Sequence, residues 1–327
     1  MSHDAAAPPI RRALVTLATA AALGLTLGGP AGAEDMTASL TAAAERLASA
    51  EAGGWSENDI SFTVEGGTVM ATLARPEVEG AVPVVVMFHG FGGSRDELPV
   101  AGTEEGVFSR TARILAENGL ASLRIDFRGS GESDGAWADT TFSSQIADGL
   151  AAVNFVRGLG RIDPNNVNIL GWSQGGLVAS AVSAGASDIV STTLWAPVAA
   201  PAASYPRLIG MEAFETALSA EPDTPIDFEL PWAEMTLNAS FFNEVWTTDP
   251  VAFMAGFGGP LLVIVGTRDD IVWPQPQAGW VYLNHHEGEE GIVVLDTDHV
   301  FDAFSGPDTV DLMANMTAAW VLDHLAR

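Results

Sequence analysis

The feature that most constrains the fold is the regular alternation of apolar, strand-like runs with amphipathic, helix-like segments. The run at 82–90 is continuously apolar and ends in glycine, as strands buried in a parallel sheet do. Segments of the two kinds then alternate toward the end of the chain, at 106–119, 121–129, 142–160, 166–172, 174–185, 189–197, 260–270, 276–285, 291–299 and 310–326. This order predicts an α/β fold with a mostly parallel central sheet and helices on both of its faces. Ahead of it, the Ala-rich stretch at 35–54 favours a helix, and residues 59–76 favour two strands joined by glycines.

The segment at 200–258 interrupts the alternation. It shows no clear strand and is rich in aromatic side chains, among them Tyr205, Phe214, Phe228, Trp232, Phe241, Phe242 and Trp246. A segment inserted after a strand of an open α/β sheet lies near the carboxyl ends of the strands, where ligands bind. We therefore expect residues 200–258 to form a cap or lid over a binding site, with most of the rings packed inside it. The core is then formed by 34–199 and 259–327.

The first 33 residues are predicted to lie outside the fold. Arg11 and Arg12 precede an apolar stretch, and Ala31-Gly32-Ala33 forms an A-x-A site before Glu34. This pattern is typical of a secretory signal peptide that is cleaved after Ala33. The alternative is a membrane anchor, because the apolar stretch is nearly long enough to span a bilayer. We expect a periplasmic or secreted protein that has no membrane contact after cleavage.

The charge and the absence of cysteine exclude several classes of function. The chain has 42 acidic residues against 14 basic ones, all arginine, and a formal net charge of −28. Such a charge repels nucleic acid and anionic lipid, so neither is expected as a partner, and solubility is its simplest explanation. With no cysteine in the sequence, thiol catalysis and thiolate metal sites are excluded.

Two stretches match the pattern G-x-S-x-G, one around Ser173 and one around Ser133. A nucleophilic serine on a sharp turn needs a strand directly before it and a helix directly after it. Ser173 has an apolar strand before it and small, helix-forming residues after it. Ser133 is followed by a poor helix start and is flanked by Glu132 and Asp134, whose charges oppose an alkoxide. The sequence therefore indicates Ser173 as a nucleophile and a polar loop near the site mouth at Ser133.

A serine nucleophile needs a base, and the base needs an acceptor for its second nitrogen. His299 follows the last apolar strand, at the sheet edge that also holds Ser173, and is the candidate base. Asp269 and Asp270 follow the preceding strand, and either can serve as the acid. The remaining histidines of the fold are expected outside the chemistry: His285 and His286 in a polar connection, His324 in the final helix, and His89 as a hydrogen-bonding support of a neighbouring loop.

Hydrolysis through a tetrahedral intermediate also needs preorganised N–H donors for the oxyanion. The backbone N–H of Gln174, directly after the nucleophile, is one candidate. The second candidate is the N–H of Phe91, in the glycine-rich loop after the strand at 82–90.

Taken together, these motifs make the chain similar to the α/β-hydrolase superfamily, and within it to capped bacterial esterases of the cinnamoyl or feruloyl type. The similar stretches are MFHGFGGSRDE, RIDFRGSGESDG, NILGWSQGGLVAS, PLLVIVGTRDDIVWP and DTDHVF, and they occur in the family's order between Val84 and Phe301. The resemblance implies an α/β-hydrolase fold with an inserted cap. It also implies Asp269 as the acid, because the family's acid stands three residues after the strand-end glycine, here Gly266. Trp172 departs from the histidine that many relatives have before the nucleophile.

The resemblance implies a serine hydrolase that cleaves small-molecule carboxylic esters through Ser173, His299 and Asp269, with no metal or organic cofactor. Because the predicted cap is acidic, we expect neutral short-chain or aromatic acyl groups rather than anionic ones. One alternative is a serine peptidase or amidase on the same fold, since the same side chains can cleave amides. The other is a binding protein of this fold without activity.

Overall fold

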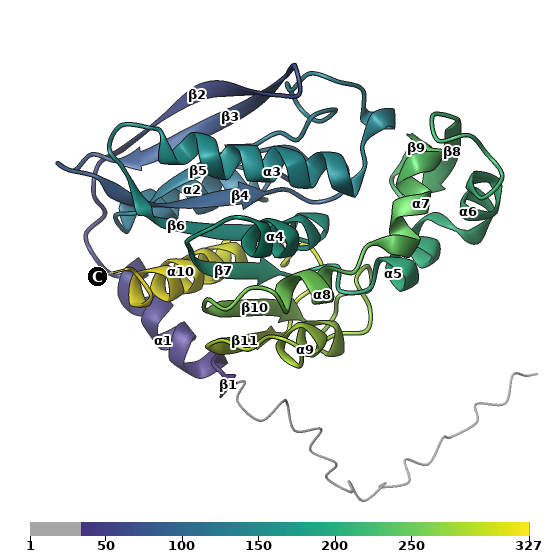
Figure 1. Ribbon diagram of the computed structural model, residues 1–327. Coiled ribbons are helices and arrows are strands. Elements are labelled where there is room, and N and C mark those ends of the chain that lie inside the picture. The colour runs from purple at the N-terminus through teal and green to yellow at the C-terminus, as the bar shows by residue number, and fades with distance from the viewer. Residues whose placement is uncertain (1–33, 327) are drawn as a thin grey trace, which may run out of the picture.

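A nine-stranded sheet runs through the centre of the computed structural model, which describes residues 34–326 (Figure 1). The strands in this sheet are β1 (Glu34–Asp35), β2 (Trp55–Val64), β3 (Gly67–Pro76), β4 (Val82–Phe88), β5 (Ala121–Ile125), β6 (Ile162–Trp172), β7 (Ile189–Trp195), β10 (Leu261–Gly266) and β11 (Glu290–Leu295). Their order across the sheet is β1-β11-β10-β7-β6-β4-β5-β3-β2. Strand β3 pairs antiparallel with β2 and β5, and the remaining pairs are parallel, which confirms the predicted mostly parallel sheet.

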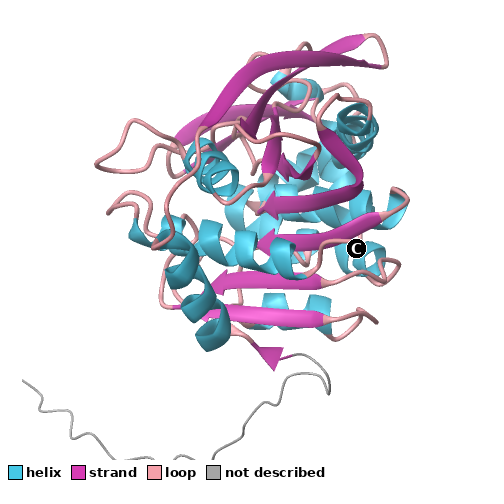
Figure 2. Ribbon diagram, turned by 90° about the vertical axis from the view of Figure 1, so that its left-hand side faces the viewer, coloured by secondary structure: helices cyan, strands magenta, loops and turns pink. Residues whose placement is uncertain are grey.

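Helices cover both faces of this sheet, as Figure 2 shows in a view turned by 90°. They are α1 (Thr37–Ala48), α2 (Val107–Glu117), α3 (Phe142–Arg157), α4 (Gln174–Gly185), α8 (Pro250–Met254), α9 (Gln277–Leu283) and α10 (Asp308–Asp323). One layer consists of α3, α4, α8 and α9, and the other consists of α1, α2 and α10. A short 3-10 helix, η1 (Trp137–Asp139), precedes α3.

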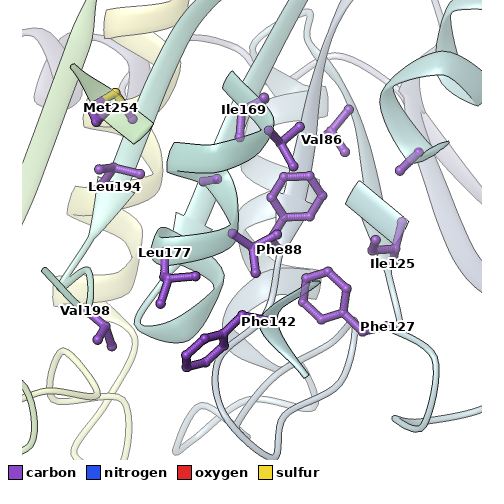
Figure 3. Close-up of a cluster of buried hydrophobic side chains, with 14 of the residues drawn as sticks. Val86, Phe88, Ile125, Phe127, Phe142, Ile169, Leu177, Leu194, Val198 and Met254 are labelled. Atoms are coloured by element: carbon purple, nitrogen blue, oxygen red, sulfur yellow. The ribbon is translucent and has the colours of Figure 1, made fainter. Parts of the chain in front are cut away.

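The apolar run of β4 is continuous because both of its faces are buried. Val84, Val86 and Phe88 face the layer that contains α4, whereas Val85 and Met87 face the opposite layer, and all five are fully buried. Figure 3 shows part of the first cluster, in which Phe88 lies among side chains from α3, α4 and β5. Burial on both faces explains why this strand shows no alternation of polar and apolar residues.

The order of the strands defines where a ligand can bind. Strand β5 follows β4 in the chain and pairs on one side of it, whereas β6 pairs on the other side. Such a reversal of direction leaves a crevice beyond the carboxyl ends of the two strands, and open α/β sheets bind ligands there.

The predicted interruption at 200–258 contains α5 (Pro201–Ile209), α6 (Met211–Ala217), β8 (Pro225–Leu230), β9 (Ala233–Asn238) and α7 (Ala239–Thr247). These elements stand together at one end of the sheet in Figure 1, and we call them the cap. The chain enters the cap after β7 and leaves it through α8 before β10, and β7 and β10 pair directly with each other. Of the cap's rings, Phe214, Phe241 and Phe242 are fully buried.

The prediction that this segment has no strand is wrong, because β8 and β9 form an antiparallel hairpin. In β8, Ile226, Phe228 and Leu230 are buried, and they alternate with the exposed Asp227 and Glu229. This is the two-residue period of a strand with one buried face.

The predicted signal peptide, 1–33, lies outside the described residues. Within residues 34–326, none of the helices has the length and apolar character that crossing a membrane requires.

Candidate active site

Ser173 occupies a strained turn between β6 and α4. Its φ is 56° and its ψ is −115°, a conformation that residues with a side chain rarely adopt. The neighbouring strand holds this turn in place, because the Ser173 N–H donates to the Trp195 carbonyl at 2.9 Å. The Ser173 carbonyl accepts from the Val198 N–H at 3.1 Å. The turn therefore fixes the serine hydroxyl at the carboxyl end of β6.

The two glycines of this motif are required by space. A Cβ at Gly171 would lie 2.2 Å from the carbonyl oxygen of Gly175, and a Cβ at Gly175 would lie 2.0 Å from that of Phe88. Both distances are far below a van der Waals contact. Only glycine at both positions lets the helix after Ser173 approach β4 and β6 this closely.

Ser173, His299 and Asp269 are joined in a series of hydrogen bonds. Ser173 Oγ lies 3.0 Å from His299 Nε2, and His299 Nδ1 lies 2.8 Å from Asp269 Oδ2. The other carboxylate oxygen of Asp269 accepts the N–H groups of Ile271 and Val272, both at 2.9 Å. This arrangement orients the carboxylate toward His299 Nδ1–H and leaves Nε2 to accept the serine proton.

The alternative acid, Asp270, does not contact His299 and is exposed on the wall of the neighbouring pocket. Asp269, by contrast, is only 3% exposed. The structure therefore brings together Ser173, His299 and Asp269. Of the two candidate acids, this is the one that the spacing from Gly266 implied.

The two predicted N–H donors follow β4 and Ser173. Phe91 lies in the loop after β4 and lines the pocket, and Gln174 is the first residue of α4. Among residues 34–326, neither N–H donates a hydrogen bond to a protein acceptor. The first N–H groups of a helix have no partner within it and favour negative charge, which suits Gln174 to an anion.

His89 holds the loop that presents Phe91. Its Nε2 accepts the Phe127 N–H at 3.2 Å, so Nδ1 holds the proton and donates to the Gly90 carbonyl at 2.8 Å. The Gly93 N–H donates to the same carbonyl at 3.2 Å. Because the peptide unit is planar, fixing the Gly90 carbonyl also fixes the Phe91 N–H in the opposite direction. Burial lowers the pKa of His89 to about 4, so it stays neutral at physiological pH.

A pocket of about 600 Å³ opens beside Ser173 and His299. It lies beyond the carboxyl ends of β4 and β6 and extends under the cap. Most of the surface comes from apolar side chains, among them Phe91, Val198, Leu208, Trp232, Met235, Ile271, Val272 and Phe304. Trp232, between the two strands of the cap hairpin, is 60% exposed. An apolar pocket of this size suits an uncharged organic ligand.

Two supports of the site were missed at the sequence level. The Tyr205 hydroxyl, from cap helix α5, donates to Gln174 Oε1, and Gln174 Nε2 donates to Gln145 Oε1 at 2.7 Å. Trp172 Nε1 donates to the His299 carbonyl at 3.3 Å, which gives this departure from the family pattern a structural role. These contacts join residues far apart in the chain, and no local pattern marks them.

Ser133 is engaged in structural hydrogen bonds. Its Oγ accepts the Met70 N–H at 2.8 Å and donates to the Asp126 carbonyl at 2.7 Å. It does not line the pocket, so the expected place near the site mouth is not observed. Within residues 34–326, no group of three or more His, Asp or Glu side chains gathers closely enough to hold a metal ion.

Comparison with known proteins places this geometry in context. A model of the alpha/beta hydrolase family matches residues 85–311. The chain is 39% identical over 119 residues to the quorum-quenching protein AidA of Acinetobacter baumannii, a match that covers 36% of each chain. It is 32% identical over 133 residues to the thiohydrolase aneE of Aspergillus aculeatus, covering 40% of this chain and 38% of that one. The chain thus spans little more than a third of the length of these curated relatives.

Solved structures extend the similarity to the whole fold. Est1E from Butyrivibrio proteoclasticus, solved with bound ferulic acid, gives a TM-score of 0.63 at 21% identity and covers 81% of this chain and 98% of its own. GrgF from a Penicillium species gives a TM-score of 0.68 at 16% identity, covering 83% of this chain and 100% of its own. At such identities, the likeness concerns the fold alone.

Proposed function

The chain belongs to the alpha/beta hydrolase family, and from this premise we propose that it is a serine hydrolase that cleaves small-molecule carboxylic esters. The observation that supports this most directly is the series of hydrogen bonds from Ser173 through His299 to Asp269, at 3.0 and 2.8 Å. A serine, a histidine and a buried carboxylate in this geometry are the parts of an acyl-transfer site.

In the proposed reaction, Ser173 Oγ attacks the ester carbonyl while His299 Nε2 takes up the serine proton. The N–H groups of Phe91 and Gln174 stabilise the negative oxygen of the tetrahedral intermediate. His299 then donates the proton to the leaving alcohol, and an acyl group remains on Ser173. Water, deprotonated by His299, attacks this acyl-enzyme and releases the acid with free Ser173.

The pocket and the cap favour neutral, apolar acyl groups. The pocket walls are mostly apolar, and the cap exposes several acidic side chains, among them Glu212, Glu229 and Glu234. A panel of uncharged esters of increasing acyl size, with a succinyl ester as the anionic member, tests this preference. Thioesters belong in the same panel, because one curated relative is named a thiohydrolase. A succinyl ester hydrolysed faster than a butyryl ester contradicts the proposed preference.

A fluorophosphonate probe tests the nucleophile. We expect labelling of the wild-type protein, and loss of both labelling and ester hydrolysis, by at least about 1000-fold, in Ser173→Ala. Ser133→Ala is the matched control, since it removes the serine of the other G-x-S-x-G stretch and should retain labelling. Labelling that persists in Ser173→Ala would rule out the proposed function.

We also propose that the chain is exported and cleaved after Ala33, as the A-x-A site before Glu34 suggests. Expression in a bacterial host followed by N-terminal sequencing tests this. A mature protein that begins at Glu34 supports export, whereas a full-length protein retained in the membrane fraction supports the anchor.

A further inference from the structure

Glu97 is the last residue of the stretch MFHGFGGSRDE, and the proposed reaction gives it no role, yet its carboxyl lies against the loop that presents Phe91. Glu97 Oε1 accepts the N–H of Gly90. A Cβ at Gly93 would lie 2.7 and 2.9 Å from the two carboxyl oxygens of Glu97, so this group packs directly over the Gly93 backbone. Glu97 also lines the pocket beside Ser173.

The carboxyl is close to the reacting centre. A Cβ at Gly90 would lie 3.4 Å from Glu97 Oε1 and 3.5 Å from Ser173 Cβ, so both groups flank the same face of Gly90. With His89 at the Gly90 carbonyl and Glu97 at the Gly90 N–H, both polar groups of this residue are held by side chains. The direction of the Phe91 N–H depends on Gly90, because the two residues share a peptide plane.

The backbone of Glu97 is held in an unusual conformation. Its φ is 61°, in the left-handed region that favours glycine. Residues with a side chain remain there when the surrounding structure requires them, and such positions are frequent at functional sites. The side chain is therefore directed into the pocket wall at a cost in backbone energy.

Within residues 34–326, Glu97 forms no ion pair. On its own loop, Arg95 pairs with Asp126, and Asp96 pairs with Arg124. The other titratable groups around it are His89 and, along the pocket, Tyr205, Asp270, Asp298 and His299. Because the carboxyl is enclosed by protein and no cation pairs with it, the pKa of Glu97 rises to about 8.

We propose that Glu97 is a positioning residue that acts as an uncharged carboxylic acid, holding the Gly90–Phe91 peptide in place, and that its ionisation weakens the oxyanion hole. This inference rests on the proposed ester hydrolysis at Ser173. A carboxylate beside the oxyanion opposes the negative charge that forms in the transition state, and the pocket screens that repulsion poorly.

The consequence is an alkaline limb in the pH dependence of activity. Below about pH 8, Glu97 is protonated and adds no negative charge beside the Phe91 N–H. Above it, a unit negative charge on the wall of the pocket beside Ser173 slows acyl transfer by about tenfold or more. The effect falls on kcat rather than KM, because the oxyanion forms only after the substrate is bound.

The test compares pH profiles of kcat and KM for a neutral ester in wild type and Glu97→Gln. Glutamine keeps the acceptor for the Gly90 N–H but cannot ionise. We expect the wild-type kcat to fall above about pH 8. In Glu97→Gln, we expect a kcat within a few-fold of wild type near neutrality and a plateau that extends about one pH unit higher or more. Glu104→Gln, which removes the same charge from an exposed position, should keep the wild-type profile.

A further variant separates positioning from charge. Glu97→Ala removes the acceptor altogether, so kcat should fall at every pH with little change in KM, and Glu97→Gln should restore most of it. An alkaline limb that is unchanged in Glu97→Gln overturns the proposal, and so does a wild-type plateau that continues to about pH 10. The second result decides the matter even if the variants do not fold.

Labelling of Ser173 by the fluorophosphonate probe distinguishes the two proposals. If Ser173 is labelled and required but the alkaline limb does not depend on Glu97, only the role of Glu97 fails. If Ser173→Ala keeps its esterase activity, the proposed function itself fails.

Discussion

At the scale of single residues, the loop proposed to stabilise an oxyanion is supported by the buried His89 and the half-buried Glu97, whose surroundings disfavour the charged form of each. Burial lowers the pKa of His89 to about 4 and raises that of Glu97 to about 8. Both shifts have the same physical origin, since enclosure disfavours the charged form of a base and of an acid alike. At neutral pH, therefore, neither His89 nor Glu97 brings a charge to the loop.

The raised pKa of Glu97 predicts how stability depends on pH. The folded protein retains a proton that the unfolded chain loses, so this group's contribution to stability is complete below about pH 4.5. It declines as the pH rises to about 8. Glutamine cannot ionise, so the free energy of unfolding of Glu97→Gln lacks this decline. The difference between the variant and wild type should therefore grow in favour of the variant, by on the order of a few kcal/mol, between these two pH values. Urea unfolding at both pH values measures the gain, and a difference that does not vary with pH contradicts it.

The sequence marks Ser173 and His299 clearly but gives no sign of the place of Glu97. Ser173 and His299 could be predicted because they come shortly after the apolar strands β6 and β11, and the strand order brings such ends together. Glu97 could not be predicted, because nothing near it in the sequence distinguishes a buried carboxyl from an exposed one. Its enclosure depends on Gly90 and Gly93 and on the packing of the pocket as a whole.

At the scale of elements, the cap contributes to the turn at Ser173 as well as to the pocket. Helix α5 provides the Tyr205 hydroxyl that donates to Gln174, and Gln174 begins the helix that follows Ser173. A polar side chain of α3, Gln145, completes the series. The cap, α4 and α3 are therefore coupled through one buried hydrogen-bonded group.

This coupling predicts the effect of Tyr205→Phe. The variant leaves Gln174 Oε1 buried without its donor, which should lower the free energy of unfolding by about 1–3 kcal/mol. It should also lower kcat, because the start of α4 is less firmly held. Tyr282→Phe is the matched control: it removes a buried hydroxyl that donates to the Val198 carbonyl at 3.0 Å but leaves Gln174 untouched. An unaltered kcat in Tyr205→Phe would contradict the coupling.

The core elements were easier to predict than the cap. Strands buried on both faces, such as β4, and the glycine-rich turn at Ser173 have strong local patterns, and the structure contains them where they were expected. The hairpin β8–β9 was missed, although Ile226, Phe228 and Leu230 alternate with acidic residues. Six-residue strands with a single pair of turn residues give a weak signal, and the proline at each end suggested a loop.

At the scale of the whole molecule, the excess of acidic side chains dominates long-range electrostatics. The formal net charge is −28, and several of the 14 basic residues are already engaged in ion pairs, such as Arg110 with Asp311 and Arg128 with Asp148. Uncompensated carboxylates repel one another and oppose the compact state.

Salt should therefore stabilise the protein. Raising sodium chloride from low concentration to about 1 M screens the repulsion and should raise Tm by a few degrees. The rise should shrink at about pH 4.5, where many exposed carboxylates take up protons. Thermal unfolding followed by circular dichroism at both pH values measures this, and a Tm that falls with salt shows that attractive pairs outweigh the repulsion.

The direct pairing of β7 with β10 has an implication for how such a protein can diversify. The chain enters the cap after β7 and returns to the sheet at the adjacent strand β10. The length of the cap therefore does not alter the register of the sheet. The cap can therefore be exchanged for another segment, and such an exchange would alter which molecules enter the pocket. The sheet and the proposed catalytic residues underneath would then stay unchanged.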